Sequence, residues 1–176
     1  MTAELFARFE LIIYLFAAIF VAAIYMGIRA VKLNNLIKNN RMENPAKFRF
    51  GVEASIAVSD EGLIGAVNFR LHTITFHVKE IAEFEILISK FCITNAKASK
   101  NDGILFAGIS DRLRPILAEE KLKDIIFAIR LKTNKAFGIR LLKGTRPRIV
   151  TESRQHNIMR LFDALEAAEK KAKGKL

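Results

Sequence analysis

The sequence predicts a mainly β protein with one N-terminal transmembrane helix: a small antiparallel β-barrel or sandwich closed by a C-terminal amphipathic helix. Three observations predict it. Residues 11–28 carry no charge, the hydrophobic pattern changes to a period of two after Pro45, and the last segment returns to a helical period. The expected segments are an external N-terminus (1–10), a transmembrane helix (11–31), a basic connector (32–47), a β domain with its closing helix (48–170) and a basic tail (171–176).

The uncharged stretch is long enough to cross a bilayer. As a helix, its residues would span roughly 27 Å, which is close to the hydrocarbon thickness. A cleaved signal peptide would need a basic start and a shorter apolar core, but Glu4 and Glu10 precede this stretch. A buried helix of a soluble domain would show a polar face, and this stretch shows none. We therefore expect a retained transmembrane helix.

The basic residues around this helix predict its orientation. Arg8 precedes it, whereas six lysines and arginines follow within about twenty residues, so the positive-inside rule places the C-terminal domain in the cytoplasm. We expect a cell inner membrane or its equivalent. The lone Cys92 fits a reducing compartment. The candidate juxtamembrane contacts are Arg29, Lys32, Lys38 and Arg41.

After the helix, the chain is rich in Asn and Lys. Residues 30–37 can continue the helix toward the cytoplasm, and Pro45 ends it. Short alternating segments then predict strands, with no long helix between them. Turns are expected at 59–62, 101–103, 133–135 and 143–145. The expected strands are 48–50, 52–58, 63–69, 72–78, 84–88, 91–94, 104–109, 125–131, 136–142 and 148–150.

The last segment has the pattern of an amphipathic helix. From Thr151 onward, one helical face carries Ile158, Leu161, Phe162, Leu165 and Ala168. Thr151 or Ser153 can cap its N-terminus. We expect this face to pack on the strands, with Glu166 and Glu169 pointing elsewhere.

Several stretches resemble the bacterial membrane-associated form of the pleckstrin-homology-like (PH-like) barrel. They are IAVSDEGLI (56–64), ITFHVKEIAEFEI (74–86), AFGIRLLKGTRPRIV (136–150) and the helix IMRLFDALEAAEK (158–170). The resemblance implies a barrel of seven or more strands with a closing helix. Lipid-binding members of the family often carry basic residues at the first hairpin, whereas this chain has Asp60-Glu61, so phosphoinositide binding is not expected there.

A PilZ-like barrel is the second candidate. That family binds cyclic dinucleotides through an Arg-x-x-x-Arg stretch and an Asp-x-Ser-x-x-Gly turn. The nearest segments, 41–49 and 68–73, match neither. A PilZ-like fold would therefore imply a copy without the usual nucleotide motif.

Residue patterns that would indicate catalysis are missing. His72 and His77 are an odd number apart in an expected strand, so they should face opposite sides. Cys92 reads as a buried small hydrophobe, and Glu80, Glu83 and Glu85 as a solvated acidic edge. The sequence has no Gly-rich phosphate loop and no paired-Cys motif. We expect neither an enzyme nor a cofactor.

Charge is unevenly distributed along the chain. Residues 46–95 hold five basic and six acidic residues, whereas residues 96–176 hold nineteen and nine. A basic face beside a bilayer attracts anionic lipid, and an acidic neighbouring subunit is an equal candidate; a merely solvated face is the alternative. Nucleic acid is disfavoured because interleaved aromatics are missing. The candidate lipid or partner contacts are Arg112, Arg114, Arg140, Lys143, Arg146 and Arg148.

These features predict a membrane-anchored scaffold or accessory subunit within a larger membrane protein complex. The small residues of the helix, among them Ala18, Ala22 and Gly27, allow close helix packing with other subunits or in an oligomer. The alternative is a membrane-tethered sensor or regulator that binds anionic lipid or a small ligand.

Overall fold

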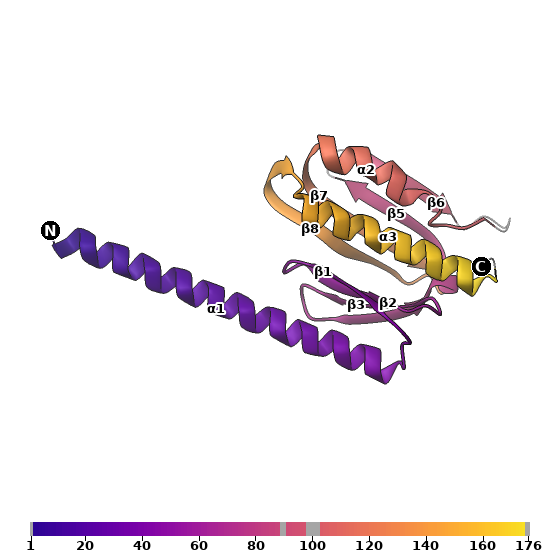
Figure 1. Ribbon diagram of the computed structural model, residues 1–176, viewed down its shortest axis with the longest axis horizontal. Coiled ribbons are helices and arrows are strands. Elements are labelled where there is room, and N and C mark those ends of the chain that lie inside the picture. Colours follow the sequence, from indigo (N-terminus) through magenta and orange to yellow (C-terminus); the bar gives the residue numbers. More distant parts are fainter. Residues whose placement is uncertain (1, 89–90, 98–102, 175–176) are drawn as a thin grey trace.

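The computed structural model describes residues 2–88, 91–97 and 103–174, with side chains for 10–88 and 103–174. Helix α1 (Thr2–Asn39) projects from the rest of the molecule (Figure 1). Its segment Glu10–Asn39 is long and apolar enough to cross a membrane, and no residue of its most apolar window is buried. The helix also runs through the first half of the expected connector, so a short link alone separates it from the first strand.

The first sheet is a four-stranded antiparallel meander. Its strands β1 (Ala46–Phe50), β2 (Ala54–Val58), β3 (Leu63–Asn68) and β4 (Thr73–His77) pair in chain order. The expected turn at 59–62 is confirmed: Gly62 has φ 88°, a left-handed conformation that favours glycine. Alternation of apolar residues thus predicted this sheet correctly.

The second sheet has the order β6-β5-β7-β8. It consists of β5 (Ile81–Ile88), β6 (Phe91–Lys97), β7 (Lys121–Leu131) and β8 (Ala136–Ile149). The turn expected at 133–135 is confirmed, with Asn134 at φ 61°. The turn expected at 143–145 is wrong, because β8 continues through it as an irregularity where the pairing with β7 shifts between Leu122 and Asp124. The turn expected at 101–103 lies largely outside the described residues, as does the side chain of Cys92.

A second helix stands where the sequence predicted a strand and a loop. After η1 (Val78–Glu80), β5 and β6, the chain forms α2 (Ile109–Glu119), so the strand expected at 104–109 is wrong. Ile109, Leu113 and Leu117 are buried at four-residue spacing, which is the signature of one helical face. Burial of that face outweighs the presence of Pro115 within the helix.

Helix α3 (Glu152–Ala172) closes the open side between the two sheets (Figure 1). Its predicted apolar face is confirmed, since Ile158, Leu161, Phe162, Leu165 and Ala168 are all buried. The Phe162 ring packs edge-on against Phe127 at 5.3 Å between centroids, and Phe84 lies 4.7 Å from Phe106 in the same cluster. Thr151 occupies the N-cap position but its side chain makes no capping hydrogen bond.

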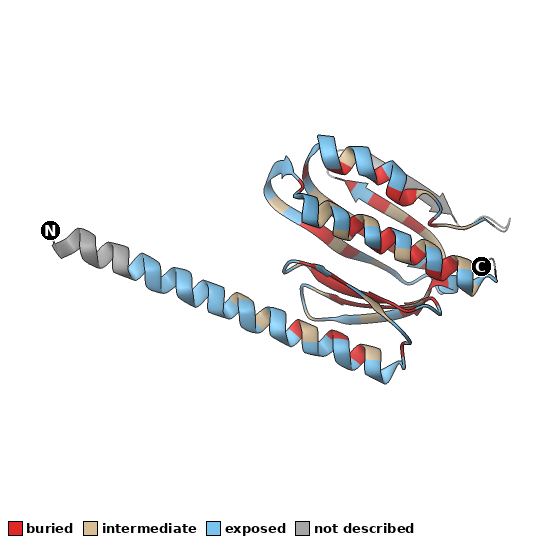
Figure 2. Ribbon diagram, in the orientation of Figure 1, coloured by how far each residue is buried: buried red, intermediate tan, exposed pale blue. Residues whose placement is uncertain are grey.

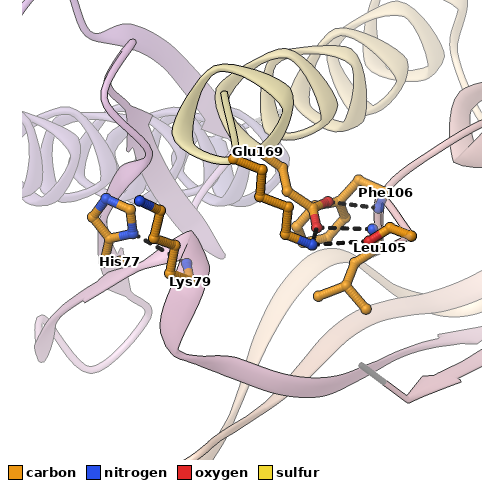
Figure 3. A network of polar contacts seen from close by, with 7 residues as sticks. His77, Lys79, Leu105, Phe106 and Glu169 are labelled. Atoms are coloured by element: carbon orange, nitrogen blue, oxygen red, sulfur yellow. Dashed lines mark hydrogen bonds and ion pairs between the residues drawn. The ribbon is translucent and has the colours of Figure 1, made fainter. Parts of the chain in front are cut away.

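Glu169 corrects one expectation about α3. Instead of pointing to solvent, its carboxylate is 1% exposed and accepts hydrogen bonds from the backbone N–H groups of Leu105 (2.9 Å) and Phe106 (3.1 Å), as Figure 3 shows. Lys173 pairs with it at 2.6 Å. Figure 3 also shows His77, whose Nδ1 accepts from the Lys79 N–H and caps η1. Glu169 thereby ties α3 to the segment that leads into α2.

Glu166 reinforces that attachment one turn earlier. Its carboxylate pairs with Lys170 at 2.7 Å and accepts from the Gly108 N–H at 3.1 Å. The hydrogen bond from Lys170 holds the pKa of Glu166 below its ordinary value, against an opposing effect of burial. Glu166 thus points away from the strands, as expected, and contacts the start of α2.

The fold class needs correction in two respects. The protein is mixed α and β, because α1, α2 and α3 together contribute as much regular structure as the strands, so "mainly β" is wrong. In the part of the chain that the structure describes, no strand pairing joins the two sheets, so the barrel is not closed. The sheets contact each other through Phe76 and Phe137, 5.0 Å apart, and share one core with α2 and α3.

Candidate functional site

The candidate site is the junction where α1 meets the first sheet. Leu33 and Leu36 are buried in the last turns of α1, and Met42 is buried just after the helix (Figure 2). These side chains belong to a small hydrophobic cluster that is separate from the main core. On the sheet, the partners Ala57 and Val67 point away from the main core. Strands β2 and β3 are therefore covered on both faces, which explains why β2 is buried along its whole length.

Small side chains on the sheet allow α1 to come close. A Cβ atom placed on Gly65 would collide with the side chain of Leu36, and its position is 3.5 Å from Leu36 Cγ. Ser55 and Ala57 on the neighbouring strand are also small and buried. The helix consequently lies directly against the backbone of β3, with no intervening side chain at residue 65.

Three polar side chains of α1 bind the turns at one end of the first sheet. The Tyr25 hydroxyl donates to the carbonyl of Phe69, the Arg29 guanidinium to that of Gly51, and Lys32 Nζ to that of Leu71 at 3.1 Å. The Tyr25 and Phe69 rings also pack at 5.9 Å. These contacts hold both the β1–β2 turn and the β3–β4 turn against the helix.

Arg29 is the most unusual of the three. Its side chain is 2% exposed, and its Nε and Nη1 atoms have no hydrogen-bond partner among the described residues. Its guanidinium lies 5.8 Å from the centre of the Tyr25 ring, a cation–π distance. It stands one residue after the uncharged stretch ends at Ile28.

Next to these contacts, the turns present apolar side chains to α1. Val52 from the β1–β2 turn and Phe69 from the β3–β4 turn are 40% and 57% exposed. Together with one face of α1 they line a hollow of about 490 Å³. The residues that α1 contributes to this hollow lie within its uncharged stretch: Ala17, Ala18, Val21, Ala22 and Tyr25.

The predicted juxtamembrane residues separate into two groups. Arg29 and Lys32 bind the sheet turns, as described above. Lys38 and Arg41 are exposed at the end of α1, and Arg41 has a positive φ of 49° where the helix stops. Two of the four residues thus position the domain rather than face outward.

The predicted lipid or partner contacts lie on the second sheet and its helix. Arg112 and Arg114 are exposed on α2, which replaces the loop expected there. Lys143, Arg146 and Arg148 are exposed on β8, whereas Arg140 is half-buried. Arg148 is near enough to Arg154 for its positive charge to lower the pKa of Arg154, after the larger effect of burial. The structure therefore places these residues on two elements, α2 and β8.

A basic pocket between β1 and the start of α3 was not predicted from the sequence. It is lined by Lys47, Arg49, Gly51, Thr151, Ser153, Arg154, His156, Asn157 and Arg160. Residues about one hundred positions apart in the sequence form it, so no local motif could have revealed it. Among the described residues, no group of three or more His, Cys, Asp or Glu side chains is placed to hold a metal ion.

Comparison of this chain with family models, curated proteins and solved structures finds no match. The function is therefore argued from the geometry of the junction and the pocket.

Proposed function

We propose that this protein is a non-enzymatic, single-pass membrane scaffold or accessory subunit that holds its α/β domain in one orientation on the cytoplasmic membrane face. The observation that carries the proposal is the continuity of α1. One unbroken helix contains both the apolar segment and the residues that pack on β2 and β3. A helix that packs on the domain transmits its own orientation, whereas a flexible connector would leave the domain free to turn.

The contacts of α1 also indicate how deep the domain lies relative to the bilayer surface. The uncharged stretch ends at Ile28, so Arg29 marks the level of the lipid headgroups. Phe69 packs on Tyr25, one helical turn inside that level, and Val52 lines the same hollow. We infer that these two turn tips enter the interfacial region of the bilayer, where their exposed apolar side chains leave water.

The charge around the helix supports a cytoplasmic domain. Six basic residues follow the apolar stretch within about twenty positions, against Arg8 before it. In the cytoplasm, the basic surface formed by the second half of the chain would lie near anionic lipid and acidic neighbouring subunits. A fixed domain with a basic outer surface is suited to organise other subunits of a membrane complex.

The fold is compatible with the PH-like proposal. Antiparallel strands followed by a C-terminal helix agree with what the resemblance implies, although in the described residues no strand pairing closes the two sheets into a barrel. Helix α2 and the long β8 are additions to that pattern. The residues that the structure describes contain no nucleotide-binding motif that would favour the PilZ-like alternative.

A disulfide between α1 and β3 tests the fixed orientation. In full-length protein with Cys92→Ala, we expect the pair Leu36→Cys and Gly65→Cys to cross-link almost completely under mild oxidation. A Cβ at residue 65 would lie 3.5 Å from Leu36 Cγ, which is where a cysteine Sγ stands. Gel-shift labelling of free thiols in membranes measures the yield.

The matched control is Lys38→Cys with Gly65→Cys in the same background. Lys38 is exposed on another face of α1, so this pair should stay reduced. Slow and similar cross-linking of both pairs would mean that the domain moves freely on its anchor, and the proposal would fail. Purification of the full-length protein in mild detergent then tests whether other subunits co-purify with it.

A further inference from the structure

The basic pocket has the composition of an anion site. It is an open pocket of about 610 Å³ between β1 and the first turns of α3, and no carboxylate of the described residues lines it. Lys47 and Arg49 come from β1, and Arg154 and Arg160 come from α3. Hydroxyl and amide donors complete the lining at Thr151, Ser153 and Asn157, so every polar side chain can donate a hydrogen bond to an anion.

The arginines of the pocket make no direct ion pair with a carboxylate of the described residues, although Glu53 is near enough to Arg154 to oppose the lowering of its pKa by burial. These arginines are Arg49, Arg154 and Arg160. Lys47 Nζ donates to the side-chain oxygen of Asn34 at 2.9 Å and makes no ion pair with a carboxylate of the described residues. Asn157 donates to the backbone carbonyl of Arg49 at 2.7 Å, which fixes α3 relative to β1. The walls are thus held in place while the cations remain free to bind.

The pKa of Arg154 shows that the positive charges around the pocket lie close together. Burial, and after it the positive charge of Arg148, lowers the pKa of Arg154 from its ordinary value, with Glu53 acting in the opposite direction. Its guanidinium lies against the β1–β2 turn, with Nη2 2.6 Å from the position that a Cβ on Gly51 would take. The partial positive charge at the N-terminus of the 21-residue helix α3 adds to the same field. An anion in the pocket would relieve this repulsion.

In the orientation proposed above, the pocket also stands at the level of the lipid headgroups. Gly51 lines it, and the carbonyl of Gly51 accepts the hydrogen bond from Arg29, which follows the last residue of the uncharged stretch. The next residue, Val52, lines the apolar hollow with Ala18 and Val21 of α1. A group that enters the pocket therefore stands beside the membrane surface, within reach of a phospholipid whose chains remain in the bilayer.

We propose that this pocket binds the phosphate group of an anionic phospholipid from the leaflet on which the domain lies. The proposal rests on the function proposed above, since the domain must stand at the bilayer surface. Arg49 and Arg160 supply charge-assisted hydrogen bonds to the phosphate oxygens, and the hydroxyls at the start of α3 bind the remaining oxygens. The bound lipid would pull the side of the domain opposite β4 toward the membrane and complete its attachment.

The test counts lipids retained by the full-length protein in an uncharged detergent, by native mass spectrometry. Phosphatidylglycerol and phosphatidylcholine of matched chain length are the probes. We expect one tightly held phosphatidylglycerol per chain. Arg49→Gln with Arg160→Gln should weaken its binding by about tenfold or more, because two hydrogen bonds between charged groups are lost.

The matched control removes the same charge elsewhere. Lys132→Gln with Lys135→Gln changes two exposed residues around the β7–β8 turn and should leave binding unchanged. Equal weakening by both double variants would show attraction to net charge only and would overturn the proposal. Retention of the two lipids to the same extent would overturn it as well.

Inorganic phosphate separates the lipid from a soluble phosphate source. At millimolar concentration it should displace part of the bound phosphatidylglycerol, because both occupy the pocket through the same group. If phosphate binds in the pocket and phosphatidylglycerol does not, the lipid assignment is wrong. Failure here would leave the cross-link between residues 36 and 65 unaffected, so it is distinguishable from failure of the proposed orientation.

Discussion

Replacement of Phe162 by alanine is expected to lower the free energy of unfolding by about 3–5 kcal/mol. The side chain is fully buried and contacts the Phe127 ring at 5.3 Å between centroids, at the centre of the aromatic cluster that joins α3 to the second sheet. Truncation removes the buried area and leaves a cavity that the surrounding strands cannot fill. Denaturant unfolding of the full-length protein in mild detergent, followed by pulse proteolysis of the domain, measures the loss.

A control on the same helix separates packing from helix propensity. Lys171→Ala changes an exposed residue whose ion pair with Asp60 is long at 3.7 Å. It should shift the free energy of unfolding by less than about 1 kcal/mol. If Phe162→Ala were equally mild, α3 would not pack as described and would be free to bind a partner.

Glu169→Ala is expected to cost about 2–5 kcal/mol, although it removes a charged residue from the protein interior. The carboxylate accepts hydrogen bonds from the N–H groups of Leu105 and Phe106, and both donors would be left without an acceptor. Each unsatisfied buried donor costs about 1–3 kcal/mol. The loss should be local at first, with the segment before α2 separating from α3 before the sheets unfold.

Hydrogen exchange reads this local effect directly. In the native protein, the amides of Leu105 and Phe106 should exchange slowly, and in Glu169→Ala they should exchange at nearly unprotected rates. Lys173→Ala is the discriminating comparison, because it removes the 2.6 Å ion pair and the hydrogen bond to the Gly103 carbonyl but leaves both hydrogen bonds from the backbone amides in place. If Lys173→Ala matched Glu169→Ala, the contacts of Lys173 rather than the backbone amides of Leu105 and Phe106 would hold the segment.

Local patterns predicted most of the secondary structure. Alternation along 52–58 predicted β2, the apolar stretch 63–69 after the turn predicted β3, and the spacing of Ile158, Leu161 and Leu165 predicted the buried face of α3. The first and the last of these signals depend on the period of the backbone alone. The prediction of a strand at 104–109 was wrong. Apolar residues lie close together there, but the four-residue spacing of Ile109, Leu113 and Leu117 favours a helix.

Contacts between distant segments could not be predicted in this way. Leu33 and Leu36 lie where the sequence predicted that the helix continues into the basic connector, and only the three-dimensional structure shows that they pack on the first sheet, with Leu36 against Gly65. One signal was present in the sequence: β2 and β3 carry small or apolar residues on both faces, which indicates a sheet covered on two sides. The basic pocket combines β1 with the start of α3, and Glu169 was misplaced because its backbone partners lie over sixty residues away.

The depth of the turn tips tests the central claim most directly. Nitroxide labels at Phe69→Cys and at Asn134→Cys, each with Cys92→Ala, can be compared by electron paramagnetic resonance in full-length protein in phosphatidylcholine nanodiscs. Asn134 is exposed in the β7–β8 turn. This turn lies at the opposite end of β4 from Phe69, because the Lys132 N–H donates to the carbonyl of Glu80, the last residue of η1, which directly follows β4. We predict that the label at 69 is relaxed by oxygen dissolved in the lipid and protected from an aqueous nickel complex, and that the label at 134 shows the reverse. Equal exposure of both labels to nickel would contradict a domain held against the bilayer by α1.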